Sequence, residues 1–140
     1  MTTPPTFAWR FDTRACAIAL GLFVLLVLLA TVGARAGWLR GFVGDVLAVA
    51  WLYFVFKTVL AARPISLALA AFAVGCALEL GQYLARLGHW QIANPVLRIV
   101  IGSTPDWLDV LAYAIGAAAV LLVELRGRLA RAARPPTSAP

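Results

Sequence analysis

The sequence predicts an all-α membrane protein, built as a bundle of four transmembrane helices. Hydrophobic residues make up 63% of its 140 residues and charged residues only 13%, whereas average globular domains are about 25% charged. The mean hydropathy is +0.90. A soluble chain of this length cannot hide so much apolar surface, because small domains bury the smallest fraction of their surface. Strand-like alternation is missing from the sequence, which argues against a membrane-spanning barrel.

The first two apolar segments cover residues 15–33 and 45–62. The first contains no charged residue and is 19 residues long, which exceeds the roughly 7 to 15 residues of a signal-peptide core, so we expect a retained helix. The second begins at Asp45 and carries Lys57 near its far end. Both are long enough, or nearly so, to cross about 30 Å of hydrocarbon.

The third and fourth segments cover residues 64–88 and 105–124. Glu79 interrupts the third segment, and Asp109 lies one turn into the fourth. The connector between them is apolar around Arg98. This pattern predicts a short interfacial or re-entrant segment between helices three and four.

The basic residues predict the topology. Four helices place both termini on one side, and eight Lys and Arg residues flank that side against four on the other. This excess favours cytoplasmic termini. We therefore expect a cytoplasmic N-terminal segment (1–14), a transmembrane domain (15–125) and a basic, disordered cytoplasmic tail (126–140). In a soluble protein the net charge of +6 would indicate nucleic acid. Here it indicates contact with anionic membrane lipid.

Four of the six acidic residues fall toward the opposite, non-cytoplasmic side. Asp45 and Asp106 suit helix starts, where carboxylates complement the helix dipole, whereas Asp109 and Glu79 are too deep for that explanation. Asp12 and Glu124 are expected to be solvated near the cytoplasmic ends. An ionisable residue inside a membrane helix costs about 2.5 to 3.5 kcal/mol on insertion scales and normally faces the bundle interior with a partner.

The spacing of the polar residues predicts that they converge. One face of the third helix carries Glu79, Gln82 and Arg86. One face of the fourth carries Asp106, Asp109, Tyr113 and Gly116. Gly116 would let another helix approach closely. Arg98 could neutralise two carboxylates. The sequence therefore predicts a polar pocket in the outer leaflet, with no recognisable metal or cofactor motif and with Glu79 and Asp109 as candidate catalytic residues.

The ordered set of motifs resembles a known family. The chain contains Gly44-Asp45, Glu79-x-x-Gln82, Arg98, Gly102-Ser103 and Asp109-x-x-Ala112-Tyr113-x-x-Gly116. This set resembles an uncharacterised, VanZ-like family of small bacterial inner-membrane proteins, with Tyr113 where VanZ-like proteins proper carry Asn. The resemblance covers roughly residues 35–120. It implies four membrane helices, a location in the bacterial inner membrane, a role in the cell envelope, and a polar cluster of Asp45, Glu79, Gln82, Arg98, Ser103 and Asp109.

Several functions remain open from the sequence. The first is a module that binds or handles an envelope lipid or a lipid-linked precursor, with Arg98 on a phosphate and the carboxylates on sugar hydroxyls or a metal. The second is a membrane enzyme that uses Glu79 and Asp109 as an acid and base pair. The others are a proton- or ion-coupled transporter and a structural or partner-binding protein without a ligand. The sequence identifies no cofactor and no oligomeric state.

Overall fold

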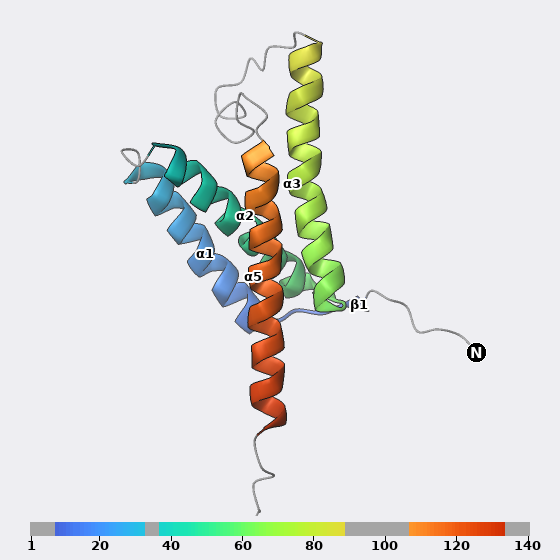
Figure 1. Cartoon of the computed structure of the whole chain (residues 1–140). Helices are drawn as coiled ribbons and strands as arrows, with labels where there is room; N and C mark the ends of the chain where they lie inside the picture. The colour runs from blue at the N-terminus through green and yellow to red at the C-terminus, as the bar shows by residue number, and fades with distance from the viewer. Residues whose placement is uncertain (1–7, 33–36, 89–106, 134–140) are drawn as a thin grey trace, which may run out of the picture.

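The computed structural model describes residues 8–32, 37–88 and 107–133. These residues form four long helices and one short antiparallel strand pair. The helices are α1 (Thr13–Thr31), α2 (Gly37–Val59), α3 (Pro64–Leu87) and α5 (Trp107–Ala132), and the strands are β1 (Ala8–Trp9) and β2 (Leu60–Ala61). In Figure 1, α1 and α3 run upward and α2 and α5 run downward. The start of α1 and the end of α5 therefore lie toward the same, lower end of the bundle.

All four helices are long and apolar enough to cross a membrane. Helices are the expected form, because in hydrocarbon every backbone N–H and C=O group must find its partner within the chain. Many large apolar side chains are exposed on the surface of the bundle, including Leu20, Leu69 and Leu122. This is expected for surfaces that face lipid. The chain is therefore a multi-pass integral membrane protein, as the sequence predicts.

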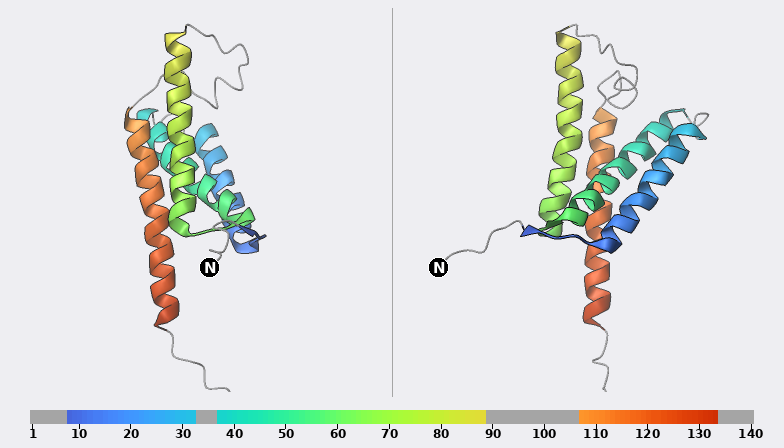
Figure 2. Two further views of the ribbon diagram at one scale, coloured as in Figure 1. Left: turned by 90° about the vertical axis from the view of Figure 1, so that its right-hand side faces the viewer. Right: turned by 180° about the vertical axis from the view of Figure 1, so that it is seen from behind.

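The bundle is organised around α2, which packs against α1, α3 and α5, while α3 and α5 also pack against each other. Viewed from behind, α1 and α2 run side by side and lean away from α3 at their upper ends (Figure 2). Arg40 holds those upper ends together, because its Nη1 donates to the Ala30 carbonyl at 3.0 Å. The core is formed mainly by small and aromatic side chains, among them Val49, Tyr53, Ala68, Ala71 and Ala112.

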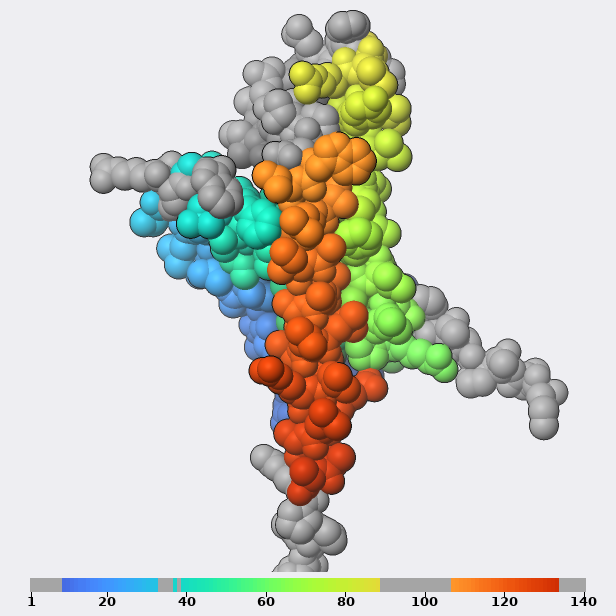
Figure 3. Space-filling view, in the orientation of Figure 1, coloured from blue at the N-terminus to red at the C-terminus, as the bar shows by residue number. Residues whose placement is uncertain are grey.

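Small residues set the closest helix contacts. A Cβ atom on Gly116 of α5 would lie 2.6 Å from the Val46 carbonyl oxygen of α2, and one on Gly75 of α3 would lie 2.8 Å from the Tyr113 ring of α5. The close approach predicted at Gly116 is confirmed. In Figure 3, α5 lies between α2 and α3, and its lower part extends below both of them.

The N-terminal segment is tied to the turn between α2 and α3. In the strand pair, Ala8 lies opposite Ala61 and Trp9 opposite Leu60, and the Asp12 N–H donates to the Thr58 carbonyl at 2.9 Å. Asp12 then caps α1, because its carboxylate accepts from the N–H groups of Arg14 and Ala15 at 3.0 and 3.1 Å. The expectation that Asp12 is merely solvated is therefore wrong.

The helix limits differ most from the predicted ones at two places. The second helix begins at Gly37 instead of Asp45, and the fourth continues to Ala132, through part of the segment expected to be a disordered tail. Both extensions contain arginines and glycines, so hydropathy alone does not reveal them. The interfacial or re-entrant segment predicted between helices three and four lies outside the described residues.

Candidate functional site

Four of the six predicted site residues lie in the described part of the chain. Asp45 is on α2, Glu79 and Gln82 are on α3, and Asp109 is on α5. Asp45 and Asp109 lie in the first half of their helices, and Glu79 and Gln82 lie in the second half of theirs; these are the upper halves of α2, α5 and α3 in Figure 1. Arg98 and Ser103 lie outside the described residues.

Three carboxyl groups from three different helices come together. The carboxyl groups of Asp45 and Asp109 lie within hydrogen-bonding reach of each other, and Glu79 is close enough to act electrostatically on Asp45. Tyr113 joins them, because its hydroxyl group donates to Glu79 Oε1 at 3.1 Å and it lies in the field of all three carboxyl groups. We call Asp45, Glu79, Asp109 and Tyr113 the carboxyl cluster.

The close contacts at Gly75 and Gly116 fix the position of the carboxyl cluster in the bundle. Because Gly75 has no side chain, the Tyr113 ring packs directly on the α3 backbone. One helical turn later, the Glu79 carboxylate accepts the hydrogen bond from the Tyr113 hydroxyl group. With no side chain at Gly116, α5 packs on the α2 backbone at Val46, next to Asp45. The same face of α5 therefore supplies both the packing surface and the polar groups.

The environments of the acids differ from those expected at two positions. Asp45 is the ninth residue of α2 and half-buried, so it does not complement a helix start. Asp109 lies in the first turn of α5, where the helix dipole favours a negative charge. Glu79 is buried, with only 7% of its surface exposed. Arg86 is exposed, so the polar face of α3 runs from the bundle interior to its surface.

The cluster has a definite chemical character. Two carboxyl groups within hydrogen-bonding reach can share one proton, and the Tyr113 hydroxyl can donate or accept. Among the described residues, no group of three or more His, Cys, Asp or Glu side chains is arranged to hold a metal ion. Within the described residues, the structure therefore gives no geometric support to a metal held by these carboxylates. It offers hydrogen-bond acceptors, with a phenol beside them.

Tyr113 was missing from the predicted site residues, although its place in the sequence pattern was visible. It follows Asp109 by four positions and precedes Gly116 by three, so it lies on the same helical face as both. This spacing is the sequence signal that could identify Tyr113 as a site residue. The sequence places this tyrosine on the polar face of its own helix. Its partner on α3 cannot be identified from the sequence, because the sequence does not show which helices pack against each other.

A second polar group lies at the lower end of the bundle. Lys57 of α2 forms an ion pair with Glu124 of α5, and only 24% and 12% of these side chains are exposed. The expectation that Glu124 is solvated is wrong. The buried Tyr53 hydroxyl group also approaches the Glu124 carboxylate, although within the described residues it has no partner at full hydrogen-bond geometry.

Comparison with known proteins identifies a family for most of this architecture. No curated protein and no solved structure matches the chain. A family model described as "protein of unknown function (DUF2809)" matches residues 34–117. The matched segment contains α2, α3, the start of α5 and every residue of the carboxyl cluster, whereas α1 and the lower half of α5 lie outside it. Because the match covers more than half of the sequence, the chain belongs to the uncharacterised DUF2809 family of proteins.

Proposed function

We propose that this chain is a bacterial inner-membrane protein of the VanZ-like type, whose carboxyl cluster binds the headgroup of an envelope lipid or lipid-linked precursor. The observation that carries the proposal is the convergence of three carboxyl groups from three helices inside an apolar bundle. The cluster lies in the half of the bundle away from the start of α1 and the end of α5 (Figure 1). With cytoplasmic termini, this half faces the outer leaflet.

Energetics favour a role beyond packing. Each ionisable group at a helix centre costs about 2.5 to 3.5 kcal/mol on insertion scales, whereas a polar contact between membrane helices contributes about 0.6 kcal/mol on average. The contact between Tyr113 and Glu79 is therefore one of the interactions that offset the cost of burying these carboxyl groups. A ligand that hydrogen-bonds to the cluster would offset a further part of this cost.

The chemistry of the cluster points to a ligand rich in hydroxyl groups. Carboxylate oxygens accept hydrogen bonds, and the nearby phenol can donate or accept one. The sugar or polyol headgroup of a lipid-linked molecule supplies such hydroxyl groups at the membrane surface. Arg98, which lies outside the described residues, is the residue that we expect to bind a phosphate.

A structural role is the second candidate, and one observation favours it. The Tyr113 ring packs directly on Gly75, and its hydroxyl group donates to buried Glu79. This half of the cluster joins α3 to α5 as a packing unit would. If packing is its only role, Glu79→Gln should lower thermal stability and change no ligand.

Native mass spectrometry of the full chain, purified from bacterial membranes in mild detergent, tests the two candidates. We expect Glu79→Gln and Asp109→Asn each to reduce a co-purified hydroxyl-rich lipid at least tenfold. Glu124→Gln is the matched control, since it removes another half-buried carboxylate at the opposite end of the bundle and should keep that lipid. If all three variants carry the same lipids as the wild type while Glu79→Gln melts earlier, the structural role is correct and the ligand proposal is wrong.

A further inference from the structure

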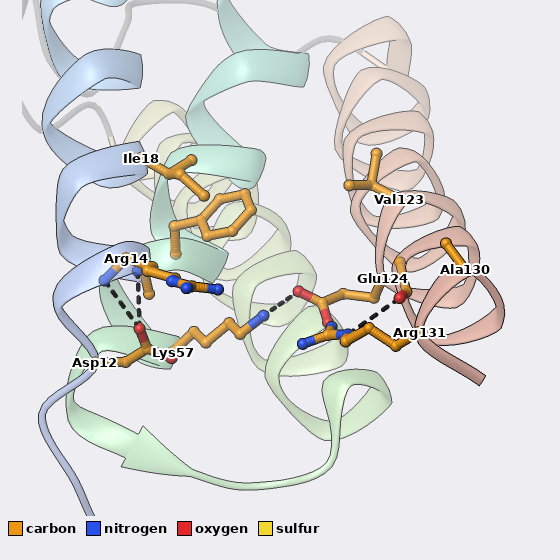
Figure 4. A pocket seen from close by; sticks show the side chains of 11 residues that line it. Asp12, Arg14, Ile18, Lys57, Val123, Glu124, Ala130 and Arg131 are labelled. Carbon is orange, nitrogen blue, oxygen red and sulfur yellow. Dashed lines mark hydrogen bonds and ion pairs between the residues drawn. The ribbon is translucent and has the colours of Figure 1, made fainter. Parts of the chain in front are cut away.

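A pocket of about 510 Å³ opens at the lower end of the bundle, far from the carboxyl cluster. One wall is the first turns of α1, the other is the lower part of α5, and Phe54 and Lys57 of α2 lie between them. Ile18 and Val123 face each other across the space (Figure 4). Its volume falls within the range of about 300 to 1,000 Å³ typical of small-molecule sites.

The charges in this pocket leave positive charge available for a ligand. Three cations and two anions line it: Arg14, Lys57, Arg131, Asp12 and Glu124. Both anions are already engaged. Asp12 caps α1 and pairs with Arg10, and Glu124 pairs with Lys57.

The two arginines are the groups that remain for a ligand. Arg131 Nε donates to the Gly127 carbonyl at 3.0 Å, which holds its side chain over the pocket. In Figure 4, the Arg14 and Arg131 side chains extend from opposite walls toward the same space. Neither guanidinium group forms an ion pair with a carboxylate of residues 8–32, 37–88 or 107–133. Guanidinium groups bind phosphate oxygens strongly, because their paired N–H donors match the geometry of the anion.

Charged and apolar groups are separated along the pocket. In Figure 4, Ile18 and Val123 lie on the side toward the middle of the bundle, and the charged side chains lie toward the start of α1 and the end of α5. A soluble anion would use only the charged side. A phospholipid would use both, because its phosphate lies at the membrane surface and its acyl chains enter the hydrocarbon.

We propose that this pocket binds one anionic phospholipid from the leaflet on the side where α1 begins and α5 ends. Arg14 and Arg131 hold its phosphate from opposite walls, and an acyl chain lies along Ile18, Phe54 and Val123. Lys57 acts as a positioning residue, because it neutralises Glu124, which would otherwise repel the phosphate. This site is separate from the carboxyl cluster and does not depend on the function proposed for that cluster.

Lipid titration followed by native mass spectrometry tests the proposal on the full, delipidated chain. We expect one phosphatidylglycerol to bind at least tenfold more tightly than phosphatidylcholine, and Arg14→Gln/Arg131→Gln to lose that preference. The matched control is Arg63→Gln/Arg126→Gln, which removes the same charge from exposed positions at the same end of the bundle but outside the pocket lining, and should bind as the wild type does. Equal loss in the two double variants would show non-specific attraction and would overturn the proposal.

Two further measurements keep the result clear. The single variants Arg14→Gln and Arg131→Gln change exposed side chains, so their melting temperatures should remain near that of the wild type while each weakens phosphatidylglycerol binding several-fold. Inorganic phosphate at millimolar concentration should not displace the lipid. If it displaces the lipid completely, the pocket is a site for a free anion and the lipid assignment is wrong.

Discussion

At Gly75, the face of the Tyr113 ring occupies the place where a methyl group would be. The added Cβ atom would lie 2.8 and 2.9 Å from two ring carbons, closer than van der Waals contact allows. Moving the ring would also move the hydroxyl group that donates to Glu79. One missing methyl group therefore controls both a helix contact and the geometry of the carboxyl cluster.

Gly75→Ala should lower the free energy of unfolding by about 1 to 3 kcal/mol, as expected for overpacking a well-packed site. The matched control is Gly81→Ala on the same helix, since a Cβ atom there meets no heavy atom within 4 Å among the described residues. That change should be neutral or stabilising by up to about 1 kcal/mol, because alanine favours helix. Thermal melting in detergent, followed by circular dichroism, measures both. Equal effects would contradict the contact at Gly75.

Individual residues of the site could be predicted only where they left a pattern within one helix. The stripe from Asp109 through Tyr113 to Gly116 was visible, because the helical period places these residues on one face. Gly75 left no such pattern, since its importance comes from a ring on another helix. The same reason explains why Lys57 and Glu124 were not paired from the sequence.

At the level of the element, the start of α1 depends on Asp12. Its carboxylate accepts hydrogen bonds from the N–H groups of Arg14 and Ala15. The first N–H groups of a helix have no partner within the helix and need one from elsewhere. The hydrogen bond from Ala15 is the largest cause of a lowered Asp12 pKa, followed by the bond from Arg14 and by the charges of Arg10 and Lys57, while partial burial opposes the change. The charged form is therefore favoured in the folded state.

Asp12→Ala should destabilise the protein by about 0.5 to 2 kcal/mol, whereas Asp12→Asn should retain most of the stability, because Asn caps a helix about as well. The stabilisation from ionised Asp12 is fully present above its unfolded pKa near 3.8 and is lost as the pH falls through the lower, folded pKa. Melting temperatures between pH 7 and pH 3 should therefore fall less steeply for Asp12→Asn than for the wild type. Identical melting temperatures of Asp12→Ala and Asp12→Asn at pH 7 would rule out a helix cap formed by Asp12.

The helices as elements were predictable, but their ends were not. Apolar segments identify the part of a helix that crosses hydrocarbon, so all four helices were expected. The helix itself continues wherever backbone hydrogen bonds continue, through Gly37–Gly44 in α2 and through Arg126–Ala132 in α5. For this reason Asp45 was expected at a helix start, where its charge would have needed no further explanation.

In the whole molecule, the two polar regions lie at opposite ends and have different relations to the family. The carboxyl cluster lies entirely within residues 34–117, which match the family model. The lower pocket depends on α1 and on residues 123–131 of α5, which lie outside the match. We therefore expect other members of the family to share the cluster.

The proposed function of the carboxyl cluster depends on the orientation of the protein in the membrane, and cysteine labelling can measure that orientation. The helices alternate in direction (Figure 1), and the excess of basic residues at the lower end favours the cytoplasm for that end. The chain has two unpaired thiols, Cys16 and Cys76, which are first replaced by alanine. Leu87→Cys, at the end of α3, and Ala132→Cys, at the end of α5, then mark the two ends of the bundle.

A membrane-impermeant maleimide added to spheroplasts should modify Leu87→Cys at once and Ala132→Cys only after lysis. Both positions are exposed, so full labelling of both after lysis is the internal control for thiol reactivity. The reverse order would place the carboxyl cluster in the cytoplasmic leaflet and the lower pocket in the outer one, and would overturn the proposal that the cluster binds a headgroup of the outer leaflet. Labelling of both positions before lysis would contradict the alternating arrangement itself, because α5 would then end on the same side as α3.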